Sequence, residues 1–432
     1  MFIRFEVENL LSFNTSATFE MIAGKVFKYH KNHEVRVAGL SVLRGAIVYG
    51  ANAAGKSNFF KAIGLFLGML RTRDCSCLIG KQFRGDGESK KKMRMELTYS
   101  HRERIFTYSV VSDGISVIEE TLSLEEDRDS VLLFERTGSN IKPNPEFLSD
   151  EWYQWRTLED SALYLTKLEA DGIRVLENKN KIKGADYIID ALSGLSNIEV
   201  LNWSSAPKAG VLYRLSEKES FHSFIKELMV KADVGITGIN WSSFTKKEQE
   251  ELVSKLPEFL TMRDKNGYIF LNHRPELVLE VENGQVVKVQ ELRIQHGDRI
   301  FKLQEESDGT QRLIELAPML YELKTGAKAY FVDEIDCHLH PMLAKEILQM
   351  FMLVPETQSQ LVVSAHDTNL LSNEIWRPDE VWFAEKRADR SSDLYSLYQF
   401  HPRFDKNLAK GYLQGAYGAI PLPRDFGKIF EK

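Results

Sequence analysis

The chain has 432 residues, of which 43% are hydrophobic and 27% are charged, and its formal net charge is −6. This length and composition are typical of a globular protein with two or three domains, and the net charge gives no general attraction to nucleic acids. No run approaches the roughly 20 apolar residues of a membrane span, and the charged opening Met1–Phe13 does not resemble a secretory signal. Three cysteines are too few for a disulfide framework, so we expect a cytoplasmic protein without a membrane partner.

The N-terminal part combines strand patterns with one helix. Alternating apolar residues in FIRFEVE predict a first strand, and the apolar run Ala46–Tyr49 predicts another directly before a glycine. An amphipathic pattern then predicts a helix from Asn58 to about Arg71. Between Met93 and Phe134 apolar residues recur with a period near two, and Asp113-Gly114 marks a hairpin turn.

In the rest of the chain the predicted secondary structure changes from mainly helical to strands, and then to alternating helices and strands. From about Phe147 to Pro257 it is mainly helical in pattern, with NIEVLNWSS as a candidate short strand, and strands resume from Tyr268 to Ile294 with a turn at Asn283-Gly284. Helical and strand patterns then alternate through QRLIELAPMLYEL, AYFVDE, PMLAKEILQMFM and SQLVVSAH, which is typical of a parallel α/β sheet. We therefore expect three segments, namely 1–146, a mainly helical insertion at 147–262, and 263–432.

The clearest motif is GANAAGKS, a G-x-x-x-x-G-K-[ST] phosphate loop between an apolar run and a helical pattern. Backbone N–H groups of such a loop surround phosphate oxygens, and the helix N-terminus favours their charge. We expect Lys56 to bridge the β- and γ-phosphates of ATP and the Ser57 hydroxyl to ligate Mg²⁺. The predicted ATP-binding residues are Gly50, Asn52, Ala53, Ala54, Gly55, Lys56, Ser57 and Asn58.

A second motif, AYFVDEID, is an apolar strand that ends in acids. There Asp333 is placed to hold Mg²⁺ through water, and Glu334 to polarise the attacking water as a catalytic residue. Such strand ends also occur in simple turns, and it is the presence of the phosphate loop that favours the catalytic interpretation.

Two weaker motifs flank this strand. Ser307-Asp308-Gly309-Thr310-Gln311 precedes a helical pattern, and His366 ends the apolar stretch LVVSAH. Ser307 is 26 residues before Asp333 and His366 is 33 after it, offsets that resemble the signature motif and switch histidine of ABC-type ATPases. In this interpretation Ser307, Gly309, Thr310 and Gln311 meet the γ-phosphate bound by another subunit, and His366 senses that phosphate.

Together these segments resemble the ABC/SMC-like AAA-type ATPases of bacterial abortive infection, a group that includes RloA, AbiL and the AriA subunit of the PARIS anti-phage system. The resemblance is carried by FEVENLLSF, the phosphate loop, ESDGTQRL, VDEIDCHLHP, SAHDTNLL and GYLQGAYGAIP. It implies a P-loop NTPase fold of the ABC-ATPase head type, with an antiparallel β lobe and an inserted, mainly helical lobe. It also makes Asp336 a candidate subunit-contacting acid and Gln82 a candidate magnesium ligand, although Gln82 also fits an ordinary surface glutamine.

A phosphate loop and a signature turn on different surfaces imply chains packed head to tail, as a homodimer or higher homo-oligomer with ATP between them. From the resemblance we expect an ATPase switch that answers a phage-encoded trigger and controls a separate effector, for which a Toprim-like nuclease is one candidate. The alternative is a DNA-repair or SMC-type ATPase that clamps duplex DNA, with Lys and Arg residues around 89–105 touching phosphates. These residues include the basic run Ser89–Arg94, which also fits a solvated loop.

Overall fold

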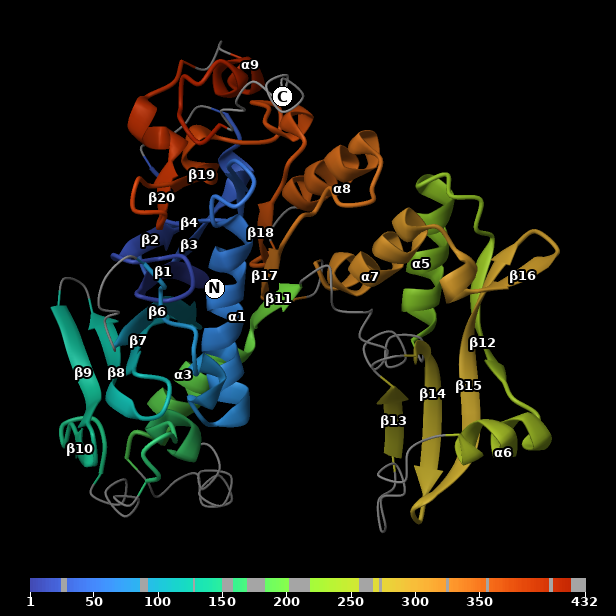
Figure 1. Ribbon diagram of the computed structural model, residues 1–432, viewed down its shortest axis with the longest axis horizontal. Helices are drawn as coiled ribbons and strands as arrows, with labels where there is room; N and C mark the ends of the chain where they lie inside the picture. The colour runs from blue at the N-terminus through green and yellow to red at the C-terminus, as the bar shows by residue number, and fades with distance from the viewer. Residues whose placement is uncertain are drawn as a thin grey trace, which may run out of the picture. The chain divides into compact units, whose positions relative to one another are not determined.

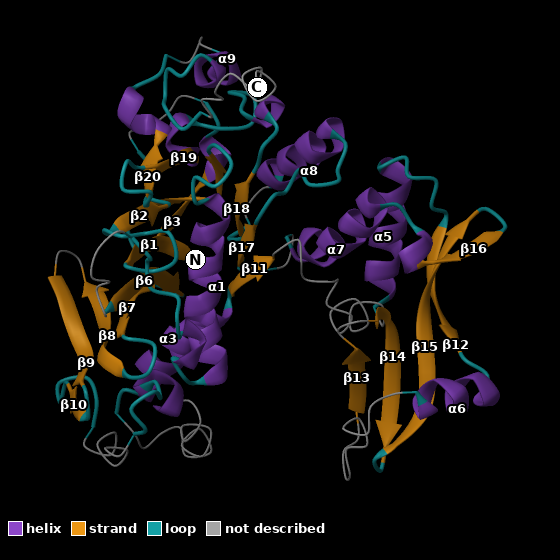
Figure 2. Cartoon of the chain, viewed as in Figure 1, coloured by secondary structure: helices purple, strands orange, loops and turns teal. Residues whose placement is uncertain are grey.

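The chain divides into two compact units, which are considered one at a time. The computed structural model describes all residues except 25–28, 86–91, 127–128, 150–157, 169–182, 202–217, 256–266, 272–273, 324–325, 355–356, 404–406 and 421–432. The first unit consists of Met1–Leu201, Gly326–Ile335 and Leu348–Lys432, and the second of Asn202–Thr325 and Asp336–Ile347. Figure 1 labels the elements of both units, and Figure 2 distinguishes their helices from their strands.

The centre of the first unit is a six-stranded sheet with the order β11-β17-β18-β5-β19-β20. Its first five strands are mutually parallel, and only β20 runs antiparallel to its neighbour. The central strands are buried along their whole length, as expected of parallel strands covered on both faces. The strands are β5 (Gly45–Tyr49), β11 (Ile198–Leu201), β17 (Ala329–Val332), β18 (Gln360–Ser364), β19 (Val381–Lys386) and β20 (Ser392–Ser396).

A second sheet of the same unit forms the antiparallel β lobe, with the order β10-β9-β8-β7-β6-β1-β2. Burial alternates along its strands as the sequence period of two predicts. Its strands are β1 (Phe2–Glu8), β2 (Ala17–Glu20), β6 (Met93–His101), β7 (Arg104–Ser112), β8 (Val117–Glu126), β9 (Asp129–Thr137) and β10 (Asn140–Pro143), beside a separate hairpin of β3 (Glu34–Val37) and β4 (Leu40–Leu43).

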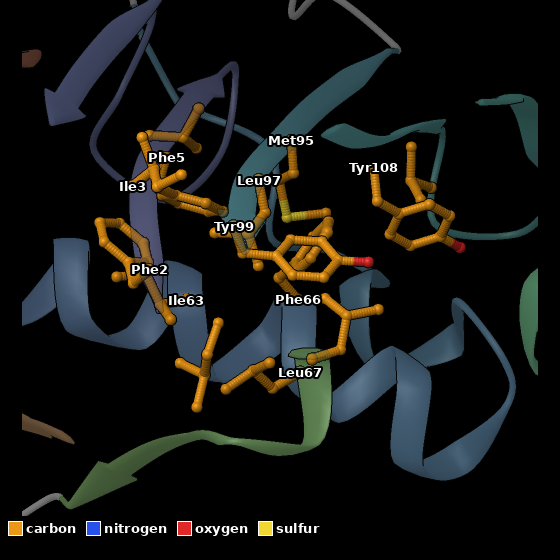
Figure 3. Close-up of a cluster of buried hydrophobic side chains, with 14 of the residues drawn as sticks. Phe2, Ile3, Phe5, Ile63, Phe66, Leu67, Met95, Leu97, Tyr99 and Tyr108 are labelled. Carbon is orange, nitrogen blue, oxygen red and sulfur yellow. The ribbon is translucent and has the colours of Figure 1, made fainter. Parts of the chain in front are cut away.

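The buried apolar side chains of helix α1 (Lys56–Thr72) belong to the main hydrophobic core. Figure 3 shows its side chains Ile63, Phe66 and Leu67 among aromatic and aliphatic residues of β1, β6 and β7. The Phe66 ring lies 5.8 Å from that of Phe5, and the Phe59 ring lies 6.4 Å from that of Phe331 in β17. The helix therefore packs on both sheets and joins them. The unit also contains α3 (Ala185–Ser196) and α9 (Leu408–Leu413), and α8 (Pro341–Leu353) follows β17 along the chain.

The second unit is built on an antiparallel sheet with the order β12-β15-β14-β13, to which β16 adds beside β15. The turn between β14 and β15 has positive φ at both Asn283 and Gly284, the conformation that an Asn-Gly hairpin favours. Helix α5 packs on α7, where the Phe221 and Tyr321 rings lie 5.2 Å apart. The elements are α5 (Glu219–Lys231), β12 (Gly238–Ser243), α6 (Lys246–Ser254), β13 (Gly267–Leu271), β14 (Arg274–Glu282), β15 (Gln285–His296), β16 (Arg299–Lys302) and α7 (Asp308–Glu322).

The fold class expected from the sequence is confirmed, because a parallel α/β sheet with a phosphate loop is joined to an antiparallel β lobe. The two units nevertheless divide the chain at different residues from the three expected segments. The described part of 147–262 contains strands as well as helices, and β11 joins the central sheet of the first unit by pairing with β17. Residues 263–325, expected in the ATPase half, belong to the second unit. Among the described residues, no helix is long and apolar enough to cross a membrane.

Gln360, a fully buried amide at the start of β18, connects the central sheet to the N-terminal strand. Its Oε1 accepts the Phe2 N–H at 2.6 Å, and its Nε2 lies 2.9 Å from the carbonyl oxygens of both Phe2 and Leu43. One side chain thus pairs backbone groups of β1 and β4 with a strand more than 300 residues later.

We expect Gln360→Met to lower the unfolding midpoint by about 5 °C or more, because each buried backbone group that loses its partner costs about 1–3 kcal/mol. Gln358→Met is the matched control, since Gln358 is exposed two residues earlier and its replacement should shift the midpoint by about 1 °C or less. Thermal unfolding followed by circular dichroism measures both variants, and equal shifts would contradict the role given to Gln360.

Candidate nucleotide-binding site

Three of the four predicted motifs meet where the parallel strands end. The phosphate loop follows β5, Asp333 and Glu334 follow β17, and His366 comes two residues after β18. Because parallel strands present their carboxyl ends at one edge of a sheet, these segments lie together. They line a cavity of about 680 Å³, whose walls are Ala51, Asn52, Ala53, Ala54, Gly55, Lys56, Ser57, Asn58, Glu334 and His366.

Two glycines of the phosphate loop are required by close packing. A Cβ on Gly50 would lie 2.3 Å from the Ala384 carbonyl oxygen, and a Cβ on Gly55 would lie 2.1 Å from the Ser392 hydroxyl oxygen. Gly55 also has a φ of +119°, a conformation that side chains rarely adopt. At these two glycines the loop therefore packs directly on β19 and β20.

Lys56 begins α1 and is buried in the loop. Its Nζ donates to the Gly50 carbonyl at 2.7 Å and lies 3.4 Å from the carbonyl oxygen of Ala51. The Lys56 side chain thus folds back over the phosphate loop and contacts its first two residues. The N-terminal turn of α1 lies at the cavity wall, where the helix dipole favours an anion.

The acidic strand end places one carboxylate inside the fold and one in the cavity wall. Asp333 is buried, and its Oδ1 accepts a hydrogen bond of 2.6 Å from the Ser364 hydroxyl. Glu334 has a φ of +53°, and its Oε1 lies 3.5 Å from Nε2 of His366. Both side chains of this pair are partly exposed, at 35% and 44%, so both can meet a molecule in the cavity.

The residues of the cavity fit a nucleotide and its cation. A volume of about 680 Å³ is in the ordinary range for a small-molecule site. Backbone N–H groups of such a loop can bind phosphate, and the Ser57 hydroxyl in the cavity wall is an oxygen ligand of the kind that Mg²⁺ prefers. The Asp333 carboxylate is a second ligand of this kind, although it is buried and does not line the cavity.

The predicted signature residues belong to the second unit, where Ser307 caps α7. The Ser307 hydroxyl oxygen accepts the Thr310 N–H at 3.2 Å and lies 2.9 Å from the Thr310 hydroxyl oxygen. The Gln311 amide donates to the Glu306 carbonyl at 2.9 Å, and a Cβ on Gly309 would lie 2.7 Å from the His338 carbonyl oxygen. Ser307 therefore caps the helix that the sequence predicts after it, while the contact with a partner's nucleotide stays a prediction. The same holds for Asp336, which is also in the second unit.

Gln82 is not among the residues that line the cavity. Its side-chain amide donates to the Asp113 carbonyl at 2.8 Å, and its backbone bridges to Leu10. These contacts connect the segment after α1 to the N-terminal loop and to a hairpin of the β lobe. They give no support to the predicted role of Gln82 as a magnesium ligand.

Ser364 is the residue of this site that the motifs did not reveal. It ends β18, is fully buried, and contacts both predicted acidic residues, because its hydroxyl oxygen also accepts the Glu334 N–H at 2.8 Å. The signal in the sequence is slight, because it is one hydroxyl that follows the apolar run Leu361–Val363, two residues before the predicted histidine.

We expect Gly55→Ala to weaken ATP binding by about 10-fold or more, because the new methyl group must displace Ser392 or distort the loop. Gly64→Ala, in the middle of α1, is the control. A Cβ there meets nothing within 4 Å, so stability should rise by about 0.5–1 kcal/mol without any loss of ATP affinity. Isothermal titration with Mg-ATP tests both, and unchanged affinity in Gly55→Ala would show that the loop is not the binding element.

Several solved structures and one family model are similar to this chain. The chain is similar to an SMC head bound to the C-winged helix domain of ScpA (13% identity, 91% of this chain and 97% of that one, TM-score 0.47). It is also similar to an SMC head domain from Thermotoga maritima (12% identity, 91% of this chain and 98% of that one, TM-score 0.41). A third similar structure is an SMC head domain with an extended coiled coil from Pyrococcus furiosus (15% identity, 93% of this chain and 97% of that one, TM-score 0.42). No curated protein matches the chain. The family model described as "AAA domain, putative AbiEii toxin, Type IV TA system" matches residues 46–372, and the chain belongs to this family.

Proposed function

We propose that the chain is an ATP-binding and ATP-hydrolysing switch of the ABC/SMC-head type, acting in the cytoplasm. The observation that carries the proposal is the single cavity that unites the phosphate loop with Glu334 and His366. A phosphate-binding loop beside a carboxylate that can activate water is the arrangement that phosphoryl transfer to water needs.

The proposal gives roles to residues in the cavity wall and to the buried Asp333 next to Glu334. The loop backbone and Lys56 hold the phosphates of ATP, and Ser57 and Asp333 hold Mg²⁺, which when bound neutralises charge on the phosphates. Glu334 accepts the proton of the attacking water. His366, 3.5 Å from that carboxylate, hydrogen-bonds the γ-phosphate and registers its loss.

The proposal includes a head-to-tail homodimer or larger homo-oligomer. All residues that line the cavity belong to the first unit, whereas the cap at Ser307 belongs to the second. A serine and a glycine at the start of a helix of 15 residues can face an anion held by another chain. Under this proposal ATP binding brings two chains together, and hydrolysis separates them.

We further propose that this switch controls a separately encoded effector in anti-phage defence, after a phage-encoded trigger is sensed. Support comes from the family match and from the narrower resemblance of the motifs to RloA-, AbiL- and AriA-type ATPases. A Toprim-like nuclease remains the candidate effector.

The alternative of a DNA clamp has weaker support. Residues 86–91, which include half of the basic run Ser89–Arg94, lie outside the described residues. The described basic residues nearby contact acids of the same chain, since Arg94 is 2.8 Å from Glu96 and Arg104 is 2.7 Å from Asp186. Such pairs reduce the positive charge that a DNA backbone would meet.

We expect Glu334→Gln to bind ATP and to stall before hydrolysis, so that its mass in solution with Mg-ATP rises from one chain to two or more. Loss of the carboxylate removes the proton acceptor but leaves the phosphate loop intact. Size-exclusion chromatography with light scattering, run with ATP, with ADP and without nucleotide, measures the change.

The double variant Lys56→Ala with Glu334→Gln is the control, because it lacks the cation that faces the phosphates and should keep one mass in all three conditions. A Glu334→Gln protein whose mass ignores ATP, although titration shows that ATP binds, would refute the proposed ATP-dependent assembly. Retention of duplex DNA only with ATP, weakening steeply with salt, would favour the clamp instead.

A further inference from the structure

Ser364 makes three contacts with the segment that carries the predicted metal ligand and general base. Its hydroxyl donates to Oδ1 of Asp333 at 2.6 Å and accepts the N–H of Glu334 at 2.8 Å. Its carbonyl oxygen accepts the Ile335 N–H at 3.0 Å. Through its side chain and its carbonyl, Ser364 thus holds the segment that follows β17, beyond the last ladder pair, Val332 opposite Val363.

The first contact fixes the carboxylate that is expected to face Mg²⁺. A buried serine hydroxyl that donates to Oδ1 limits rotation of the carboxylate and commits that oxygen to the protein. Carboxylates that serve a metal generally need such partners to hold their orientation. Loss of the hydroxyl would remove this restraint on the Asp333 carboxylate.

The second contact holds a backbone conformation that Glu334 would not adopt unaided. A φ of +53° is costly for a residue with a side chain, on the order of 1 kcal/mol or more. This conformation directs the chain so that the Glu334 carboxylate reaches the cavity wall and comes within 3.5 Å of His366. The Ser364 hydroxyl oxygen accepts the N–H of this same residue, so one atom supports both the carboxylate of Asp333 and the backbone of Glu334.

We propose that Ser364 is a positioning residue for the nucleotide site, which orients Asp333 toward the cation and holds Glu334 in the conformation needed to activate water. This inference rests on the proposed function. It assigns to Ser364 no contact with nucleotide, because the residue is fully buried and is not part of the cavity wall.

A buried serine can also be purely structural, and the chain offers a matched example. Ser359 lies directly before the same strand, is equally buried, and donates from its hydroxyl to the Gly326 carbonyl at 3.0 Å. Ser359→Ala and Ser364→Ala each remove one buried hydroxyl next to β18, but only the second removes contacts to Asp333 and Glu334. The pair separates lost stability from lost positioning.

The first measurement is the affinity of Mn²⁺ for the ADP complex, followed by electron paramagnetic resonance of free Mn²⁺. We expect Ser364→Ala to weaken Mn²⁺ binding by about 10-fold or more, the effect of losing a hydrogen bond to a charged group. The affinity for ADP without a divalent cation should stay within about twofold of wild type, because the phosphate loop is unchanged. Ser359→Ala should leave both quantities unchanged.

The second measurement is steady-state ATP hydrolysis. We expect Ser364→Ala to lower kcat by about 10- to 100-fold with a much smaller change in KM when Mg²⁺ is saturating, since the misplaced group acts in the transition state. Ser364→Thr, which keeps a hydroxyl, should recover most of the activity. Should Ser364→Ala not fold, Ser364→Cys keeps the volume with a weaker donor and should show the same defects in a milder form.

Equal Mn²⁺ affinity and equal kcat in Ser364→Ala and Ser359→Ala would overturn the assignment. A wild-type protein that neither hydrolyses ATP nor binds Mn²⁺ with ADP would instead overturn the proposed function itself. The two failures are therefore distinguishable, because the first requires an active wild type.

Discussion

The parallel register of three strands is the constraint on which the nucleotide cavity depends. Val48 of β5 lies opposite Ser364 of β18, and Val363 lies opposite Val332 of β17. The three strands therefore end at nearly the same level, and the loop at Gly50, the acids after Val332 and the histidine after β18 leave the sheet together. A slip of one residue in either pairing would turn alternate side chains to the opposite face and separate these groups.

This register joins parts of the chain that are far apart in sequence. The phosphate-loop strand β5 is flanked by β18 and β19, both of which come after residue 359, so neither neighbour belongs to the N-terminal half. Gln360 contributes by pairing with Phe2 and Leu43, and α1 contributes by placing Phe59 between the β lobe and Phe331. The contacts that build the core therefore also bring the phosphate loop and the acidic strand together. For this reason strands that are far apart in the sequence can form one site.

Much of this arrangement could be predicted from the sequence, because its signals are local. The phosphate loop needs a strand before it and a helix after it, and β5 and α1 are where the patterns place them. Three features could not be predicted. Whether β11 joins the central sheet depends on its pairing with β17, some 130 residues later, and no periodicity within β11 encodes that partner. The position of Ser364 beside Asp333 depends on the register of β17 and β18, and Gln82 is held by a hairpin whose approach the local sequence does not reveal.

Gly309 and Ser307 of the predicted signature segment make contacts within their own unit that are compatible with the proposed contact to a partner's phosphate. Within the second unit, glycine is required at position 309 because the His338 carbonyl oxygen would lie 2.7 Å from any Cβ. Ser307 is similarly occupied as the cap of α7, where its oxygen accepts the Thr310 N–H and shares a hydrogen bond with the Thr310 hydroxyl. A serine hydroxyl has one proton and two lone pairs. If Thr310 supplies the proton of the shared bond, the hydrogen of Ser307 is left to point outward toward a phosphate, and the cap survives contact with a partner chain. The proposed assembly then requires no rearrangement of α7.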